Sequence, residues 1–282
     1  MQNITYIDDS LKQENASQYI LSIRYATDGL SFCIHDGNNR LLAFSFQPFH
    51  LSESDENALI AQTIQAIGNE PLLNLRYKKV YVLSCNRNKQ LVPEEFFNKN
   101  TIADLYHLSL PLPSNHVLLY RKIPNKNYYL VEALPRHFIQ FLNNRYASSL
   151  IVVNSAYPFI IYSLSNILFN TPYLFIDIHE QYFDMLISRN DKISLFNTYT
   201  FHSVHDIAYY ALNGLEHCLL DKENLQSVIS GNGVNKSTFI NSMQKYIPNI
   251  SILNYAPLSQ LVKHNELNNS MFIHLLNIHK CE

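Results

Sequence analysis

Glycine is scarce in this chain: six of the 282 residues are glycine, about 2% against the ~7% usual in globular proteins. Nucleotide-binding folds use glycine where the backbone must approach phosphate closely, so this chain has few positions for such loops. Tryptophan is absent, whereas there are 19 tyrosines and 16 phenylalanines. We interpret these aromatic residues as core packing, and an aromatic surface for a protein partner is the alternative.

Three further features narrow the class of protein. The four cysteines stand singly, without a C-x-x-C pair, which is typical of reduced thiols in the cytoplasm. The net charge of −2 gives no reason to expect nucleic acid or an anionic membrane as partner. No apolar run reaches the roughly 18 residues of a membrane span, and the first 15 residues are polar, unlike a secretory signal. The sequence therefore predicts a cytoplasmic globular protein without an integral membrane segment.

Two stretches of the chain, 19–84 and 173–230, share one expected order of elements. Each has three short strands with alternating apolar residues, then a capped helix, then a fourth strand. The strands and helix are expected at 19–24, 30–35, 41–46, 54–67 and 79–84 in the first copy, and at 173–178, 182–188, 193–200, 204–219 and 225–230 in the second. This tandem repeat predicts a two-lobed α/β protein, with lobes at 1–155 and 156–282.

The segment between the two copies is expected to contain further elements. Residues 86–90 read as a polar loop, and Pro93 suits the first turn of a helix over 94–106. Residues 108–132 are expected to form a small insertion that includes a hairpin. In the first copy, Ser52 is the expected N-cap of the helix. The tail after 257 has helical character without a predicted role.

The duplicated layout resembles the actin-like ATPase superfamily, whose fold is ribonuclease H-like with duplicated β-β-β-α-β-α units. It most resembles bacterial actin homologues of cell division and pilus assembly, and an uncharacterised bacterial family expected to carry this fold. The resemblance covers roughly 19–253. Besides topology and Leu91-Val92-Pro93 before a helix, it rests on three loop motifs: Ile23-Arg24-Tyr25-Ala26, Ile176-Asp177-Ile178-His179 and Ile229-Ser230-Gly231-Asn232-Gly233.

The resemblance implies where a nucleotide would bind. Active members place an Asp-x-Gly turn after the first strand of each half, and these turns hold the phosphates, Mg²⁺ and the attacking water. Here Arg24 stands at the first expected Asp and Ala26 at the first expected Gly, with Tyr25 between them. In the second turn Asp177 is retained, but His179 replaces the glycine. Asp177 is therefore the single candidate catalytic residue.

The third loop fits the adenosine-binding segment of the family best, and it comprises Ser230, Gly231, Asn232 and Gly233. An ordinary turn before a helix is the alternative interpretation. In the first two loops, Arg24 would repel a metal ion, while Ala26 and His179 place side chains where bare backbone should meet phosphate. Because phosphoryl transfer depends on positioning and metal electrostatics, we expect ATP hydrolysis to be lost. No metal site is predicted.

Three functions remain open from the sequence. The first is a catalytically inactive scaffold or regulator that binds an unidentified protein partner and needs no cofactor. The second is an active ATPase or small-molecule kinase with unusual loops, in which ATP and Mg²⁺ would act with Asp177. The third is a metal-independent binder of an anion held by Arg24 and His179, although both can also be ordinary polar residues at strand ends. The glycine poverty and Arg24 favour the first.

Overall fold

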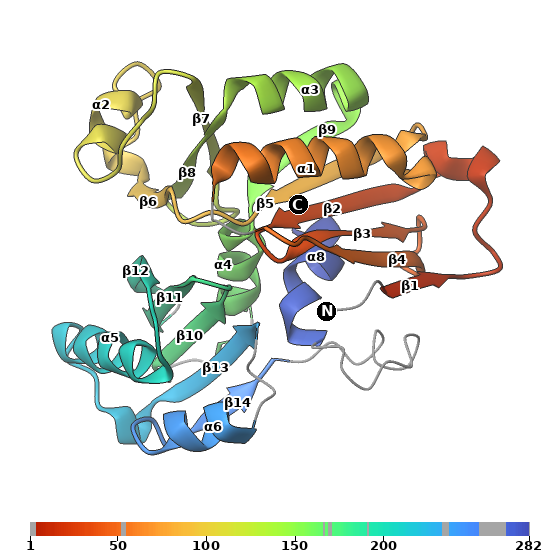
Figure 1. Ribbon diagram of the computed structural model, residues 1–282. Helices are drawn as coiled ribbons and strands as arrows, with labels where there is room; N and C mark the ends of the chain where they lie inside the picture. The colour runs from red at the N-terminus through yellow and green to blue at the C-terminus, as the bar shows by residue number, and fades with distance from the viewer. Residues whose placement is uncertain are drawn as a thin grey trace. The chain divides into compact units, whose positions relative to one another are not determined.

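The structure is a computed structural model that describes residues 4–51, 55–165, 167–168, 171–190, 192–232, 237–253 and 269–281 (Figure 1). The chain forms two compact units. The first comprises Met1–Ser155 and Leu275–Lys280, and the second comprises Ala156–His274 and Cys281. Among the described residues, no helix has the length and apolarity needed to cross a membrane.

The first unit is built on a six-stranded sheet in the order β1-β4-β3-β2-β5-β9. The strands β1 to β4 pair antiparallel, and β2, β5 and β9 run parallel. The bounds are β1 Ile4–Ile7, β2 Ile20–Ala26, β3 Gly29–His35, β4 Leu41–Pro48, β5 Lys79–Ser84 and β9 Leu150–Asn154. The strand β1 was not predicted from the sequence, because the first 15 residues are mostly polar. This short strand is held by pairing with β4, which is distant in sequence.

Two helices pack against this sheet, α1 (Glu56–Asn69) and α3 (Arg136–Tyr146) (Figure 1). The apolar stripe of α1, which includes Ile60 and Ile67, joins Phe138 and Leu142 of α3 in one buried core with β2 and β5. Asp55 caps α1, since its carboxylate accepts a hydrogen bond from the Asn57 N–H at 2.8 Å. The expected cap Ser52 lies outside the described residues.

A second, three-stranded sheet of the first unit has the order β6-β8-β7, with bounds β6 Lys89–Pro93, β7 His116–Lys122 and β8 Tyr128–Pro135. The expected helix over 94–106 is wrong: the chain makes a 3₁₀ turn at Glu94–Phe96 and a short helix, α2, at Ile102–His107. The expected polar loop overlaps β6, which is held by its antiparallel pairing with β8. Pro93 ends this strand in an extended conformation, with φ −57° and ψ 142°.

The second unit has a five-stranded sheet in the order β12-β11-β10-β13-β14. Its described elements are α4 Ala156–Ser165, β10 Tyr173–Ile178, β11 Tyr182–Arg189, β12 Lys192–Thr200, α5 Val204–His217, β13 Gln226–Gly231, α6 Ser237–Gln244 and β14 Ile250–Ile252. The helix α8, Ile273–Asn277, begins in this unit and continues into the first, which includes Leu275–Lys280. The remaining 3₁₀ segments among the described residues are Gln13–Gln18, Pro71–Asn74, Ala147–Ser149, Lys222–Asn224, Asn269–Phe272 and Ile278–Lys280.

The two sheets have the same topology, which confirms the predicted duplication. In chain order of the repeat, both sheets run third, second, first, fourth and fifth strand: β4-β3-β2-β5-β9 and β12-β11-β10-β13-β14. In each copy a helix joins the third and fourth strands, α1 in the first and α5 in the second. A Ser203–Asp206 capping box begins α5, which is the capped helix expected at 204–219.

Candidate functional site

Arg24 and Asp177 occupy equivalent positions in the two units. The innermost pair of the β2–β3 hairpin is Ala26 with Gly29. In the β10–β11 hairpin, the His179 N–H bonds to the Tyr182 carbonyl at 2.9 Å and closes the corresponding pair. Arg24 and Asp177 therefore each lie two residues before the last pair. Both lie inside their strands rather than just past them, because β2 runs to Ala26 and β10 to Ile178.

The guanidinium of Arg24 forms a bidentate ion pair within its own hairpin. Its two terminal nitrogens donate to the two carboxylate oxygens of Asp28, each at 2.9 Å. Both side chains are buried, with 6% and 8% exposed. This fork-to-carboxylate arrangement is the one that would otherwise bind phosphate. The carboxylate of Asp28 therefore occupies the position on Arg24 that an external anion was expected to take. Binding of an external anion at Arg24 stays a prediction.

The other residues of the first loop are also buried. Ala26 ends β2, and Tyr25 is next to it in the same strand. Burial raises the pKa of Tyr25, and the nearby Glu132 carboxyl acts in the same direction. Ala26 leaves a methyl group at the position where the resemblance calls for glycine.

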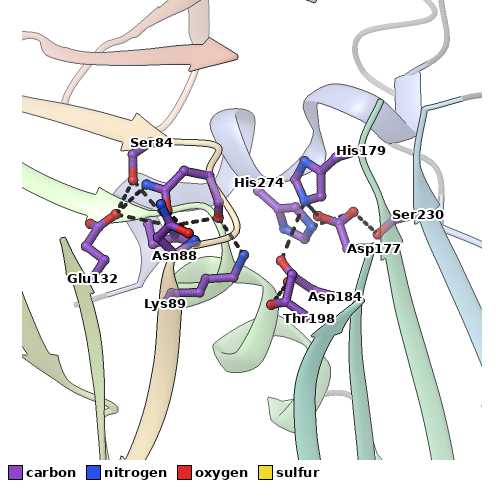
Figure 2. Close-up of polar contacts among 12 residues, drawn as sticks. Ser84, Asn88, Lys89, Glu132, Asp177, His179, Asp184, Thr198, Ser230 and His274 are labelled. Atoms are coloured by element: carbon purple, nitrogen blue, oxygen red, sulfur yellow. Dashed lines mark hydrogen bonds and ion pairs between the residues drawn. The ribbon is translucent and has the colours of Figure 1, made fainter. Parts of the chain in front are cut away.

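The carboxylate of Asp177 is the centre of a buried polar cluster in the second unit, here called the Asp177 cluster: Asp177, His179, Asp184, Thr198, Ser230 and His274 (Figure 2). Ser230 donates its hydroxyl to Asp177 Oδ1 at 2.6 Å. The Nε2 atoms of His179 and His274 lie 3.2 Å from Asp177 Oδ2 and Oδ1 respectively. Burial alone would raise the pKa of Asp177, but the two imidazoles hold this pKa well below its usual range.

A second carboxylate, Asp184, extends the cluster from β11. Its Oδ2 lies 3.6 Å from His179 Nε2, and its Oδ1 accepts a hydrogen bond from the Thr198 hydroxyl at 2.6 Å. Asp184 lies directly across from Asp177 in the antiparallel pairing of β10 and β11. Asp184 is a charged residue within the otherwise apolar start of β11. Its position opposite Asp177 in the expected hairpin could therefore have been inferred from the sequence.

The third loop has a structural role at the end of β13. Gly231 has φ +100°, and a Cβ atom there would clash with the Ile178 backbone of β10. The next residue, Asn232, donates its N–H to the Ile178 carbonyl at 2.7 Å. Ser230 lies inside β13 and Gly233 lies outside the described residues. Because Gly231 has no side chain, the end of β13 can lie directly against the backbone of β10.

The C-terminal segment of the chain covers the carboxyl ends of β10 and β13. Ser270 donates its hydroxyl to the Gly231 carbonyl at 2.9 Å, and His274 contacts Asp177. The residues 270–274 are all buried. In open α/β sheets, the carboxyl ends of the strands are where ligands bind. The sequence contained no signal for this contact, because neither Ser270 nor His274 belongs to a recognisable motif.

Side chains also fill the corresponding strand ends of the first unit. The Glu132 carboxylate of β8 accepts hydrogen bonds from Ser84 at the end of β5, from Asn86 at 3.2 Å and from Asn154 at 3.1 Å (Figure 2). Lys89 donates to the Asn86 carbonyl at 2.8 Å. Burial raises the pKa of Glu132, while the three donors act against it. This second cluster was also not predicted.

The residues present do not fit Mg²⁺ and nucleotide phosphates in the way the resemblance implies. A cation sits where the first carboxylate should be, and it is already paired with Asp28. The retained carboxylate, Asp177, is 2% exposed and surrounded by Ser230 and two imidazoles. Within the described part of the chain, no group of three or more His, Cys, Asp or Glu residues is arranged to hold a metal ion.

The fold is nevertheless shared with known structures. A protein of Bacteroides thetaiotaomicron, described as having an actin-like ATPase fold and unknown function, aligns with a TM-score of 0.78 at 22% identity, covering 96% of this chain and 99% of that one. A chain of the PilM–PilN type IV pilus biogenesis complex aligns with a TM-score of 0.59 at 15% identity, covering 93% and 98%. The ethanolamine utilization protein EutJ of Carboxydothermus hydrogenoformans gives 0.54 at 9% identity, covering 98% and 93%.

These similarities show the fold and confirm the predicted class: the chain has the actin-like ATPase fold. Among curated protein sequences, none is significantly similar to it. A family model does match, over residues 8–250, which is most of the chain, and its description is a protein of unknown function, DUF3822. The chain therefore belongs to the DUF3822 family.

Proposed function

We propose that this protein is a catalytically inactive member of the actin-like ATPase fold, which acts in the bacterial cytoplasm as a scaffold or regulator through contacts with a protein partner. The observation that carries this proposal is the buried, bidentate pair of Arg24 and Asp28. It places a satisfied cation at the position where phosphoryl transfer needs a metal-binding carboxylate. Binding Mg·ATP there would require breaking this pair and burying a repelled metal ion.

The Asp177 cluster supports the same proposal. A carboxylate can coordinate Mg²⁺ only with an oxygen that faces an open site, because Mg²⁺ retains most of its water ligands. Asp177 instead accepts the Ser230 hydroxyl and faces two imidazoles beneath the buried C-terminal segment. Both oxygens of the Asp177 carboxylate already have contacts within the chain, so a nucleotide-bound metal ion has little to bind there.

If the protein does not turn over nucleotides, we expect it to act by binding another protein. One of the structures with a similar fold is that of the PilM–PilN type IV pilus biogenesis complex, so a protein of this fold does assemble with another protein. The present chain presents several large apolar side chains to solvent that a partner can cover, among them Phe96 and Leu108 near α2 and Tyr209 on α5. The identity of the partner does not follow from these residues.

The proposal is tested by thermal unfolding of the purified protein with ATP, with and without Mg²⁺, alongside a phosphate-release assay. Binding at 100 times the dissociation constant would stabilise the folded state by about 2.7 kcal/mol. We expect no Mg²⁺-dependent shift and no phosphate release above the buffer rate. A Mg²⁺-dependent shift of that size that disappears in Asp177→Asn would overturn the proposal and establish an active nucleotide site.

A further inference from the structure

The C-terminal segment 269–274 belongs to the second unit, and it contacts the strand ends of that unit as a bound peptide would. Its hydroxyl group at Ser270 bonds to the Gly231 carbonyl at the end of β13, and its imidazole at His274 lies 3.2 Å from the Asp177 carboxylate of β10. Between these two polar contacts, Met271, Phe272 and Ile273 are 6%, 1% and 2% exposed. The His274 ring also packs edge-on against Phe159 of α4, with ring centroids 5.6 Å apart.

The receiving surface has chemistry of its own that matches this segment. It offers a backbone carbonyl as acceptor, an ionised carboxylate held by Ser230, and an apolar contact with Phe159. A carboxylate in a buried environment needs a donor or a cation opposite it. The imidazole of His274 meets that need, and no covalent constraint requires the donor to belong to the same chain.

We propose that the carboxyl ends of β10 and β13 form a peptide-binding site, and that residues 269–274 are its intramolecular ligand. The partner that fits is a protein segment with a hydroxyl side chain, three apolar residues and then an imidazole that can donate a hydrogen bond to the carboxylate. Such a segment must displace the tail, so the tail controls access to the site. This inference rests on the proposed function, because it assigns to a partner peptide the strand ends that an ATPase would use for phosphates.

The first experiment measures binding of a fluorescein-labelled, end-capped synthetic peptide of residues 269–276 to the full-length protein by fluorescence anisotropy. In the wild-type chain the tail competes at high effective concentration, so we expect weak binding. His274→Ala weakens the intramolecular ligand while leaving the receiving residues in place. We expect this variant to bind the peptide about tenfold more tightly than wild type, which is the effect of removing one buried charged contact.

Two matched controls test whether the gain comes from this site. A peptide carrying His274→Ala is expected to lose most of the gain, and the double variant Asp177→Asn, His274→Ala is expected to bind the unmodified peptide no better than wild type. Ser270→Ala is a milder variant that weakens the tail by removing its hydrogen bond to the Gly231 carbonyl. We expect it to bind the labelled peptide severalfold more tightly than wild type, and it replaces His274→Ala if that variant does not fold. Equal peptide binding by wild type and both tail variants would overturn the inference. That result leaves the nucleotide test unaffected, so the two proposals fail separately.

Discussion

Two buried histidines of the first unit, whose rings are in contact, make its stability depend on pH. The rings of His35 on β3 and His279 in the C-terminal 3₁₀ segment lie 4.0 Å apart. The Nε2 atom of His35 and both ring nitrogens of His279 have no hydrogen-bond partner among the described residues. Burial lowers the pKa of His35 to about 3, and the neighbouring His279 and Lys280 act in the same direction. Burial also lowers the pKa of His279, to about 4.

Both pKa values are depressed, so each histidine is neutral in the folded protein and takes up a proton mainly when the chain unfolds. The unfolded state then binds more protons below about pH 6.5, and the free energy of unfolding falls as the pH falls. Between pH 7.5 and pH 5, a histidine with a folded pKa of about 3 loses about 2 kcal/mol of stability. His279 adds to this loss with the same sign.

The measurement is urea unfolding followed by circular dichroism at pH 7.5 and pH 5, on wild type and on His35→Phe. The variant keeps an aromatic ring in contact with His279 but cannot be protonated, so we expect its loss of stability between the two pH values to be smaller by about 2 kcal/mol. Its absolute stability can differ at both pH values without affecting this difference. The exposed His137 on α3 provides a matched His→Phe control, which is expected to behave as wild type. The reasoning is refuted if His35→Phe loses as much stability as wild type, within about 0.5 kcal/mol.

Three further predictions concern contacts at the strand ends, and each is tested by denaturant unfolding. Gly231→Ala is expected to lower the free energy of unfolding by about 3 kcal/mol or more, because a side chain at φ +100° is strained and clashes with the backbone of β10. The control Gly37→Ala adds a methyl group in open space and is expected to change this free energy by less than about 0.5 kcal/mol. Asp28→Ala is expected to cost roughly 3–5 kcal/mol, because it removes the carboxylate that faces both terminal nitrogens of the buried Arg24 guanidinium. Adding Arg24→Met is expected to recover part of that loss, and a double variant no more stable than Asp28→Ala contradicts the pairing. Glu132→Leu is expected to cost about 1–3 kcal/mol for each of its two buried donors, Ser84 and Asn154. Glu132→Gln keeps an acceptor and is expected to be tolerated at pH 7, where burial penalises the ionised carboxylate, and equal losses in the two variants contradict this account.

Much of the architecture could be read from the sequence because it is encoded locally. The alternation of apolar residues, the turn residues and the capping pattern at Ser203 are properties of short segments, and they predicted β3, β5, β10 and α5 nearly to the residue. The repetition of this pattern indicated the duplication and hence the fold. Predictions from local sequence were wrong where pairing with a strand distant in sequence decides the conformation, as for β1 and for β6, which ends at Pro93.

The candidate site was predicted in part for the same reason. From the sequence, the resemblance implies that Arg24 stands where an acidic residue is expected and that Asp177 is retained, and the scarcity of glycine leaves few positions for phosphate loops. Only the tertiary structure decided what those residues contact. Asp28 meets the Arg24 guanidinium because the hairpin turn folds back on its strand, and His274 meets Asp177 although they lie almost 100 residues apart. Residue identity is a property of the chain, whereas the partner of a buried charge depends on which distant segments the fold brings together.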